Sequence, residues 1–346
     1  MMQRTAKLLP ATDDSIREAA AALCAGKLVA FPTETVYGLG GDAFNPRALA
    51  RIFEAKGRPR FDPLIIHIAA LEALGRIADL RALDAASRRR LDRLASALWP
   101  GPLSLILPKL PSVPDLATSG LPTVAVRWPA QPAARQLILR STGAVAAPSA
   151  NPFGGLSPTR AEHVRDSLGD RIDYILDGGP SAVGLESTVL DLATGAPRIL
   201  RPGGVSREQI EAIIGPVPAG ITGTGPGLQS PGQLPSHYAP ATRLEACERE
   251  AMLSLPERPG EGWLFFSGAS RDTWLGNLAG DKGGAAIDRL WTLSEAGNPA
   301  EAAARLFQTL HEMDERGLSC IHAELPPEAG LGAAIRDRLL RAGKRG

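Results

Sequence analysis

Cysteine is scarce in this chain of 346 residues, which contains only Cys24, Cys247 and Cys320. The three are far apart in the sequence, their number is odd, and no C-x-x-C motif occurs. This pattern argues against a disulfide framework and against a zinc module. A reducing cytosol is the compartment that fits it best.

Long hydrophobic runs and an excess of one charge are also missing. No apolar run approaches the roughly 18 residues that a membrane-spanning helix needs, and the first residues, MMQRTAKLLPATDDS, are too polar for a signal peptide. We therefore expect a cytoplasmic protein without membrane association. Lysine plus arginine number 38 against 37 acidic residues, so any polyanion must bind at a local cluster of cations.

Several common signatures of catalysis are absent too. The sequence has no G-x-x-x-x-G-K-[ST], so ATP would not be held by a P-loop, and it has neither G-x-S-x-G nor H-E-x-x-H. The stretch GTGPG at residues 223–227 does not join a strand to a helix, so it is a poor dinucleotide-binding fingerprint.

The length predicts two domains, because 346 residues exceed the size at which a single core usually stops growing. Residues 216–240 are crowded with glycine and proline and lack apolar periodicity, which predicts a connector. We therefore expect a first domain over residues 1–215, a linker over 216–240 and a second domain over 241–346.

Helix and strand patterns alternate along both domains. In the first they follow no strict strand-helix-strand rhythm, which favours a mixed α/β sheet, and the second resembles a small doubly wound domain. The expected helices cover residues 12–26, 45–57, 84–98, 131 onward, 157–168 with Ser157 near its cap, 206–214 with a Ser206/Gln209 capping box, 299–316, and a segment after 332. The expected strands cover residues 27–31, 63–69, 104–108, 123–128, 143–148, 172–176, 187–192, 262–266 and 318–325.

Two loops of the first domain carry groups that suit a ligand. In FPTETVYGLGGDA, residues 31–43, glycines allow close backbone approach beside threonine hydroxyls, although a loop that merely turns explains the pattern about as well. In the turn KGRPR, Lys56, Arg58 and Arg60 surround a helix end and suit a triphosphate. A solvated basic turn is the commoner explanation of such a cluster.

Further candidates lie next to apolar strands. His67 stands inside such a strand, where a histidine is more often a satisfied core residue than a catalytic one. Arg127 needs an anion, and either a structural Asp or Glu or a substrate carboxylate would serve. The hydroxyl, amide and basic groups that adjoin other strands are Ser149, Asn151, Ser157, Ser187 and Arg201.

Taken together, five ordered motifs give the first domain a family resemblance. They are PTETVYGLG, the KGRP turn with its downstream PLIIH, the SAN triplet, STVLD and RPG. In this order and spacing they resemble the YrdC-like domain of the threonylcarbamoyl-AMP synthase family. The connector segment SPGQLPSHYAP and the α/β domain after it resemble the long, two-domain form of that family.

The resemblance implies a YrdC-like mixed twisted sheet with a large ligand cavity, followed by a smaller Rossmann-like domain. It implies a nucleotidyltransferase that makes L-threonylcarbamoyl-AMP and pyrophosphate from L-threonine, bicarbonate or CO2, and ATP. Mg²⁺ would be held through the ATP phosphates and not by protein side chains. The product would pass to a tRNA threonylcarbamoyl transferase complex, which modifies the adenosine next to the anticodon.

Transferred position by position, the resemblance assigns residues to both substrates. Lys56 and Arg58 are expected to be catalytic and to contact ATP. The expected contacts of L-threonine are Thr35, His67, Arg127 on the carboxylate, Ala147 and Ser187. The other expected contacts of ATP are Asp62, Thr123, Ser149, Asn151, Ser157, Arg201 and Tyr238.

Two features of the expected ATP site stand out. Asp62 occupies a position where the family commonly has asparagine, which puts an anion near the phosphates. The connector is expected to close over the site as a lid, with Tyr238 reaching back to the nucleotide and water excluded from the labile product.

The strongest alternative is an RNA-binding module without catalytic turnover, because YrdC-like domains have been regarded as binders of double-stranded RNA. A near-zero net charge and the lack of basic residues interleaved with aromatic ones count against it, so we expect no direct sequence-specific nucleic-acid binding. A carbamoyl-phosphate-using hydrogenase maturation enzyme would need acylphosphatase-like and zinc-finger segments that the sequence lacks. Residue types alone do not separate threonine from serine as the substrate.

Overall fold

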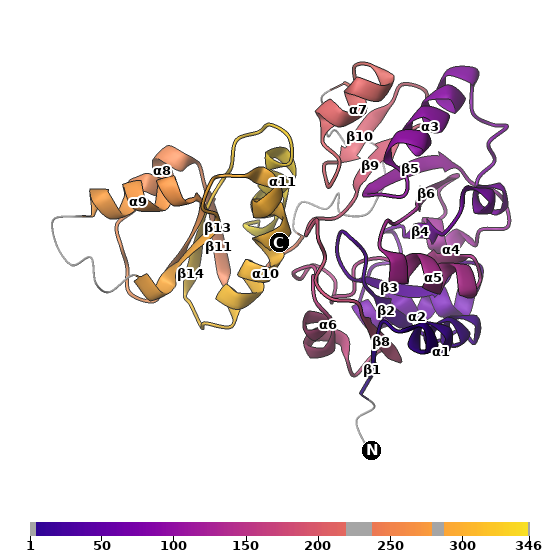
Figure 1. Cartoon of the computed structure of the whole chain (residues 1–346), viewed down its shortest axis with the longest axis horizontal. Helices are drawn as coiled ribbons and strands as arrows, with labels where there is room; N and C mark the ends of the chain where they lie inside the picture. The colour runs from indigo at the N-terminus through magenta and orange to yellow at the C-terminus, as the bar shows by residue number, and fades with distance from the viewer. Residues whose placement is uncertain (1–4, 219–236, 279–286, 345–346) are drawn as a thin grey trace. The chain divides into compact units, whose positions relative to one another are not determined.

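The computed structural model describes residues 5–218, 237–278 and 287–344, which form two compact units (Figure 1). The first unit takes in most of the chain up to residue 218. The second takes in the described residues from 237 onward together with the short segments Gly154–Leu156 and Val183–Leu185. Most of the expected lid, residues 219–236, lies outside the described residues.

The described part of the first unit is built on a sheet with the strand order β1-β8-β2-β3-β7-β4-β6-β5-β9-β10. Pairs such as β4 with β6 are parallel and pairs such as β5 with β6 are antiparallel, so the predicted mixed sheet is confirmed. The strands are β1 Lys7–Pro10, β2 Val29–Phe31, β3 Gly38–Asp42, β4 Ile65–Ile68, β5 Leu103–Pro108, β6 Thr123–Arg127, β7 Ala144–Ala146, β8 Tyr174–Asp177, β9 Thr188–Asp191 and β10 Arg198–Arg201.

Helices pack against both faces of this sheet. One apolar cluster joins α1 and α5 to residues such as Val29, Phe31 and Val145, and a larger one joins α2, α3 and α6 to the opposite face. The described helices are α1 Asp13–Cys24, α2 Pro46–Lys56, η1 Leu71–Arg76, α3 Ala85–Leu98, α4 Asp115–Thr118, α5 Pro132–Arg140, α6 Ala161–Leu168 and α7 Arg207–Ile214.

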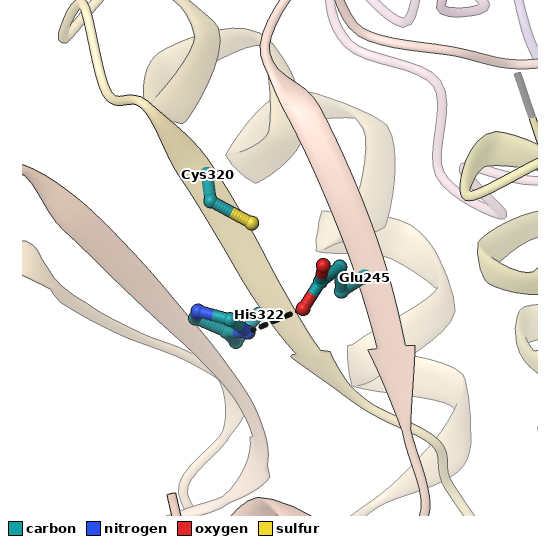
Figure 2. Close-up of side chains that lie close together, drawn as sticks. All are labelled: Glu245, Cys320 and His322. Atoms are coloured by element: carbon teal, nitrogen blue, oxygen red, sulfur yellow. Dashed lines mark ion pairs between the residues drawn. The ribbon is translucent and has the colours of Figure 1, made fainter. Parts of the chain in front are cut away.

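The second unit contains a parallel sheet in the order β11-β14-β12-β13, in which β11 and β14 lie side by side (Figure 2). The residue Trp263 packs with α8 and α9, whereas the neighbouring Gly262 faces Met313 of α10, so helices cover both faces. This arrangement confirms the doubly wound expectation. The elements are β11 Arg243–Cys247, α8 Arg249–Leu253, β12 Glu261–Ser267, α9 Gly268–Asn277, η2 Ile287–Arg289, β13 Leu290–Ser294, α10 Pro299–Asp314, β14 Cys320–Glu324 and α11 Gly332–Ala342.

Helix boundaries agree with their sequence signals at most positions. The side chains of Thr12 and Asn298 cap α1 and α10, and Ser206 and Gln209 form both bonds of the predicted capping box of α7. The predicted helix start near Ser157 is wrong. The helix α6 begins at Ala161 without a side-chain cap, because the Ser157 hydroxyl donates to the carboxylate of Glu186 instead.

No helix in the described ranges is both long and apolar enough to cross a bilayer.

Helix α2 leads into the basic turn at Lys56, so the cap at its amino-terminal end matters for the site. A substitution at Asn45 tests this cap directly. The Asn45 side chain accepts from the amides of Arg47 and Ala48, and Asn45→Ala removes that acceptor. We expect the variant to lose about 1 kcal/mol of the free energy of unfolding of the first unit, measured by denaturant titration.

Two matched variants accompany this test. Asn45→Asp keeps an acceptor and should stay close to the wild type. Arg47→Ala changes an exposed residue of the same turn and should cost less than about 0.5 kcal/mol. An alanine variant at position 45 that is as stable as the Arg47 variant would contradict the capping role.

Candidate active site

A row of polar side chains crosses the middle of the first unit's sheet. His67 on β4 lies directly opposite Arg127 on β6, and Arg127 lies opposite Ser104 on β5. Opposed residues of neighbouring strands project to the same face of a sheet. Because His67 also lies opposite Val145, this is the face against which α1 and α5 pack.

The same face has an apolar floor around the polar row. A small buried cluster contains Ile65, Ile106, Ala125, Val189 and Leu200. Among the residues that the structure describes, none from a helix belongs to this cluster. Polar groups that converge over an apolar floor are typical of a ligand-binding site.

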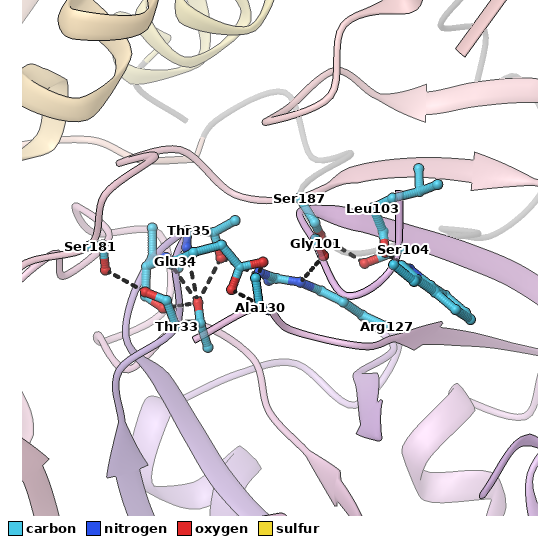
Figure 3. A network of polar contacts seen from close by, with 12 residues as sticks. Thr33, Glu34, Thr35, Gly101, Leu103, Ser104, Arg127, Ala130, Ser181 and Ser187 are labelled. Atoms are coloured by element: carbon cyan, nitrogen blue, oxygen red, sulfur yellow. Dashed lines mark hydrogen bonds and ion pairs between the residues drawn. The ribbon is translucent and has the colours of Figure 1, made fainter. Parts of the chain in front are cut away.

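Arg127 is buried and makes hydrogen bonds to two other parts of the chain (Figure 3). Its Nε donates to the carbonyl oxygen of Gly101 at 3.3 Å, its Nη1 to Thr35 Oγ1 at 2.7 Å, and its Nη2 to Glu34 Oε1 at 2.6 Å. The other carboxylate oxygen of Glu34 accepts from the amide of Ala130 at 3.1 Å. The sequence left open whether the anion beside Arg127 is a structural carboxylate or the carboxylate of a substrate. A structural carboxylate is present, and it is that of Glu34.

The loop before β3 is ordered by its own hydroxyl groups. Thr33 Oγ1 donates to the carbonyl oxygen of Val36 at 2.6 Å and accepts from the amides of Thr35 and Val36. It also lies 2.8 Å from Thr35 Oγ1. Since Thr33 has given its only hydroxyl proton to Val36, Thr35 donates to Thr33 and accepts from Arg127. This local network fixes the Thr35 hydroxyl beside the guanidinium (Figure 3).

Two of the three cations in the basic turn after α2, Lys56 and Arg58, are buried. The explanation that the turn is merely a solvated basic segment is therefore wrong for these two residues. Lys56 Nζ donates to the carbonyl oxygens of Ser149, at 2.6 Å, and Asn151. Arg58 donates to the carbonyl oxygens of Asp62 and Pro63 and forms an ion pair of 2.9 Å with the Asp62 carboxylate. Of the three cations of the turn, only Arg60 is exposed, as a solvated residue would be.

Arg201 brings a third cation near the same carboxylate. It donates from Nε and Nη2 to the carbonyl oxygen of Ser187, at 3.2 and 2.9 Å. The fully buried Asp62 has its pKa raised by burial, against the opposing charges of Arg58, Lys56 and Arg201. Three cations around one carboxylate form the local positive cluster that a nearly neutral chain requires for binding a polyanion.

Lys56 holds its proton weakly in this environment. Burial, reinforced by the positive charge of Arg58 and opposed by Asp62, lowers the pKa of Lys56 well below its usual value. An anion that binds beside the amine would favour its charged form and raise that pKa. The cluster is therefore electrostatically prepared for a negatively charged ligand.

His67 is buried beside Arg127 and stays uncharged. Its Nδ1 lies 3.2 Å from the carbonyl oxygen of Ile65, which can only accept, so the neutral ring carries its proton on Nδ1. Burial, with the charge of Arg127 as the second cause, lowers the pKa of His67 to about 3. The imidazole can accept a hydrogen bond at Nε2 but offers no positive charge at neutral pH.

Several other expected residues lie around the same part of the sheet. Ser187 Oγ is 2.7 Å from Ser104 Oγ and 3.2 Å from Arg201 Nη2. Thr123 is on β6 at an even spacing from Arg127 and so projects to the same face. The amide of Ala147 donates to the carbonyl oxygen of Ile65 on β4. These contacts connect the expected threonine residues with the expected ATP residues.

Tyr238 is placed differently, because it belongs to the second unit. Its buried ring packs 5.8 Å from the ring of Phe307, with the Arg338 guanidinium 4.9 Å from its centroid. Its backbone has a φ of 65°, which is unusual for a residue other than glycine.

The sequence motifs did not single out Glu34, Ser104 or Glu186. Glu34 lies within the quoted PTET motif, but a glutamate in a loop usually faces solvent, so its burial was not apparent. Ser104 becomes recognisable only from the pairing of β5 with β6. Glu186 accepts from Ser157, across a separation in sequence that no local pattern encodes.

Comparison with known proteins covers both parts of the chain. The family model Sua5_yciO_yrdC, described as "Telomere recombination", matches residues 21–203. A second model, described as "Threonylcarbamoyl-AMP synthase, C-terminal domain", matches residues 205–343.

Individual relatives match over nearly their whole length. The threonylcarbamoyl-AMP synthase of Bacillus subtilis is 41% identical over 96% of this chain and 94% of its own. That of Pyrococcus abyssi is 42% identical over 94% and 93% of the two chains. A crystal structure of P. abyssi Sua5 complexed with L-threonine matches with a TM-score of 0.84 and 38% identity over 97% of both chains. Since this similarity spans sequence and fold across both units, the chain belongs to the threonylcarbamoyl-AMP synthase family.

Proposed function

We propose that this enzyme synthesises L-threonylcarbamoyl-AMP and pyrophosphate from L-threonine, bicarbonate or CO2, and ATP. The amine nitrogen of threonine bonds to the carbon of CO2 and loses a proton, or bonds to the carbon of bicarbonate with loss of water, to give a carbamate. A carbamate oxygen then attacks the α-phosphate of ATP, and pyrophosphate leaves. We further propose that the cytoplasmic product is consumed by a tRNA threonylcarbamoyl transferase, since a mixed carbamic-phosphoric anhydride is an activated acyl donor.

One observation carries the proposal: an arginine in a hydroxyl-lined setting is connected to a buried cationic cluster through Ser104, Ser187 and Arg201. Arg127 makes three hydrogen bonds to the described residues and has five N–H donors, so its remaining donors can meet the carboxylate of an amino acid. Lys56, Arg58 and Arg201 suit the phosphates. The names of the relatives and the threonine complex of P. abyssi Sua5 support the same substrates.

The side chains would act by position and charge, because no covalent enzyme intermediate is needed. Arg127 would orient threonine by its carboxylate, with Thr35 and the neutral His67 beside it as polar contacts. Lys56 and Arg58 would stabilise the charge that develops on the phosphates. Mg²⁺ would arrive with ATP and neutralise phosphate charge without a set of protein ligands.

Burial of the cations disfavours the RNA-binding alternative. The exposed fractions of Lys56, Arg58 and Arg201 are 3%, 7% and 4%. Contact with the phosphates of an RNA duplex requires cations on an accessible surface. A small polyphosphate that enters the site suits these residues better.

A mass-spectrometric assay tests the reaction itself. Protein with ATP, Mg²⁺, bicarbonate and L-threonine should yield the threonylcarbamoyl adenylate and an equal amount of pyrophosphate. L-Serine in place of L-threonine measures the amino-acid preference. Absence of an adenylate with every amino acid, in protein shown to be folded, would refute the proposed function.

The role of Arg127 is tested by calorimetry of threonine binding. Arg127→Ala should weaken threonine binding about 10- to 100-fold, because a charged hydrogen-bond partner of the carboxylate is lost. ATP affinity should change little. The variant also leaves Glu34 buried without its cation, so its melting temperature should fall as well.

Glu34→Gln separates the two roles of that ion pair. It removes the same salt bridge but leaves the guanidinium for the substrate, so threonine should bind as tightly as to the wild type or more tightly. If Arg127→Ala binds threonine normally, or if both variants lose binding equally, Arg127 is a structural residue only.

The buried turn is tested by comparing turnover with stability. Lys56→Ala and Arg58→Ala should each reduce kcat by about 100-fold or more, because they remove charge that faces the reacting phosphates. Arg60→Ala, two residues further along and exposed, is the matched control and should retain activity.

A double variant distinguishes catalysis from folding at this turn. Arg58→Ala leaves Asp62 buried without its ion-pair partner, and adding Asp62→Asn removes that charge. The double variant should regain melting temperature without regaining turnover. Recovery of both together would mean that Arg58 serves the fold alone.

A further inference from the structure

The second unit contains a cluster of potential metal ligands that the proposed reaction does not use. Glu245 on β11 lies directly opposite His322 on β14, and Cys320 is two residues before His322 on the same strand. This spacing places all three side chains on one face of the sheet. One ligand atom from each lies within 4.8 Å of the others, and Figure 2 shows the side chains gathered together.

The two nitrogens of His322 have different surroundings. Nε2 lies 2.8 Å from a carboxylate oxygen of Glu261, to which a neutral ring can donate its one proton. Nδ1 has no hydrogen-bond partner among the described residues, and the nearest carboxylate oxygen of Glu245 is 3.4 Å away. The side chain is buried, with 3% exposed. The lone pair of Nδ1 therefore faces a carboxylate oxygen, an arrangement that a cation bound to both atoms would stabilise.

The arrangement around the ring matches the way proteins orient a metal-bound histidine. Such a histidine usually donates its other N–H to a carboxylate, as His322 does toward Glu261. The ring of Trp263 stacks on His322 at 5.9 Å between centroids, which fixes the plane of the imidazole. The ring is therefore held with Nδ1 directed toward Glu245 and on the side of Cys320 (Figure 2).

Cys320 supplies a third donor atom beside Glu245 and His322. Cys320 is buried, and the carboxylates of Glu245 and Glu261 both face His322 beside it. Each carboxylate also has an arginine nearby: Arg243 pairs with Glu245, and Arg258 lies 3.8 Å from Glu261. A bound divalent cation would compensate the carboxylates and deprotonate the thiol.

We propose that Glu245, Cys320 and His322 bind a divalent transition metal ion of the zinc class. Sulfur, nitrogen and oxygen donors together suit Zn²⁺ and disfavour the hard cations Mg²⁺ and Ca²⁺. Three protein ligands leave a fourth position for water or an exogenous group. The side chain of Glu245 is 40% exposed, which gives the ion access from solvent.

The cysteine spacing in the sequence indicated no zinc module, because such modules draw their ligands from closely spaced residues. Here the ligands come from two strands that are distant in sequence and are brought together by parallel pairing. The cluster occupies the first three positions of these strands, since Cys320 is the first and His322 the third residue of β14, and Glu245 is the third residue of β11.

Metal binding by the full chain is the primary test. Protein stripped with a chelator should bind about one Zn²⁺ in competition with a zinc indicator, and Zn²⁺ should raise its melting temperature. A protein with Cys24→Ser and Cys247→Ser retains Cys320 as its only thiol. Co²⁺ added to that variant should give the near-ultraviolet charge-transfer absorption of a thiolate ligand.

The ligand variants then locate the site. Cys320→Ser should abolish the charge-transfer band, and Glu245→Gln and His322→Gln should weaken Zn²⁺ binding at least tenfold. Glu261→Gln, which alters the partner of His322 Nε2 and removes the charge that faces Arg258, should weaken it about 10- to 100-fold. Cys247→Ser is the matched control, because Cys247 lies on the same strand and face as Glu245 and outside the cluster.

Three outcomes would overturn the proposal. Wild-type protein that binds no Zn²⁺ above the level of Cys320→Ser contradicts it, as does a Co²⁺ spectrum without a thiolate band in the variant that keeps only Cys320. If Cys320→Ser fails to fold, unchanged Zn²⁺ affinity in the Glu245→Gln variant decides against the site. In each case the cluster would be a hydrogen-bonded network without a metal ion.

Discussion

The buried ion pair between Arg127 and Glu34 is the interaction on which the first unit's site depends. It joins the end of β6 to the loop between β2 and β3, and through Glu34 it also reaches the amide of Ala130 just before α5. Pairing two charges away from water is a weak source of stability, but breaking such a pair is costly. The pair therefore fixes the relative positions of its three segments, and the hydroxyl of Thr35 is ordered as a consequence.

Local features of the fold were readable from the sequence, whereas long-range ones were not. Asn298 before Pro299 and the Ser206/Gln209 box specify their helices because capping involves residues within one turn. Ser157 carried the same kind of signal, but the distant Glu186 accepts its hydrogen bond. Short strands such as β1, with only Leu9 of its residues buried, lacked the alternation that would have revealed them.

The same distinction applies to the candidate sites. The residue types of Lys56 and Arg58 indicated a place for phosphate, but their burial and the exposure of Arg60 follow from how the turn packs against residues 149–151. The identity of the anion beside Arg127 could not be deduced, because Glu34 is distant in sequence. Likewise, the pairing of β11 with β14 determines that Glu245 faces His322, and no motif encodes that register.

The second unit uses the two ends of its parallel sheet differently. In doubly wound folds ligands usually bind at the carboxyl ends of the strands. Here Glu324, the last residue of β14, accepts from the amide of Phe266 at 2.8 Å and from the hydroxyl of Ser270 at 2.7 Å. Ser294, the last residue of β13, likewise donates to Glu301. These polar groups satisfy one another within the fold.

The two carbonyl oxygens that hold Lys56 have a consequence for thermodynamic coupling. Both carbonyls bind the charged ammonium form of Lys56 more strongly than the neutral amine. An anion beside Lys56 would also bind the ammonium form more strongly than the amine. The ordering of residues 149–151 and the occupancy of the proposed anion site would therefore be linked through one proton. By reciprocity, a substitution that loosens this segment lowers anion affinity without touching the anion, and a bound anion tightens the segment in return.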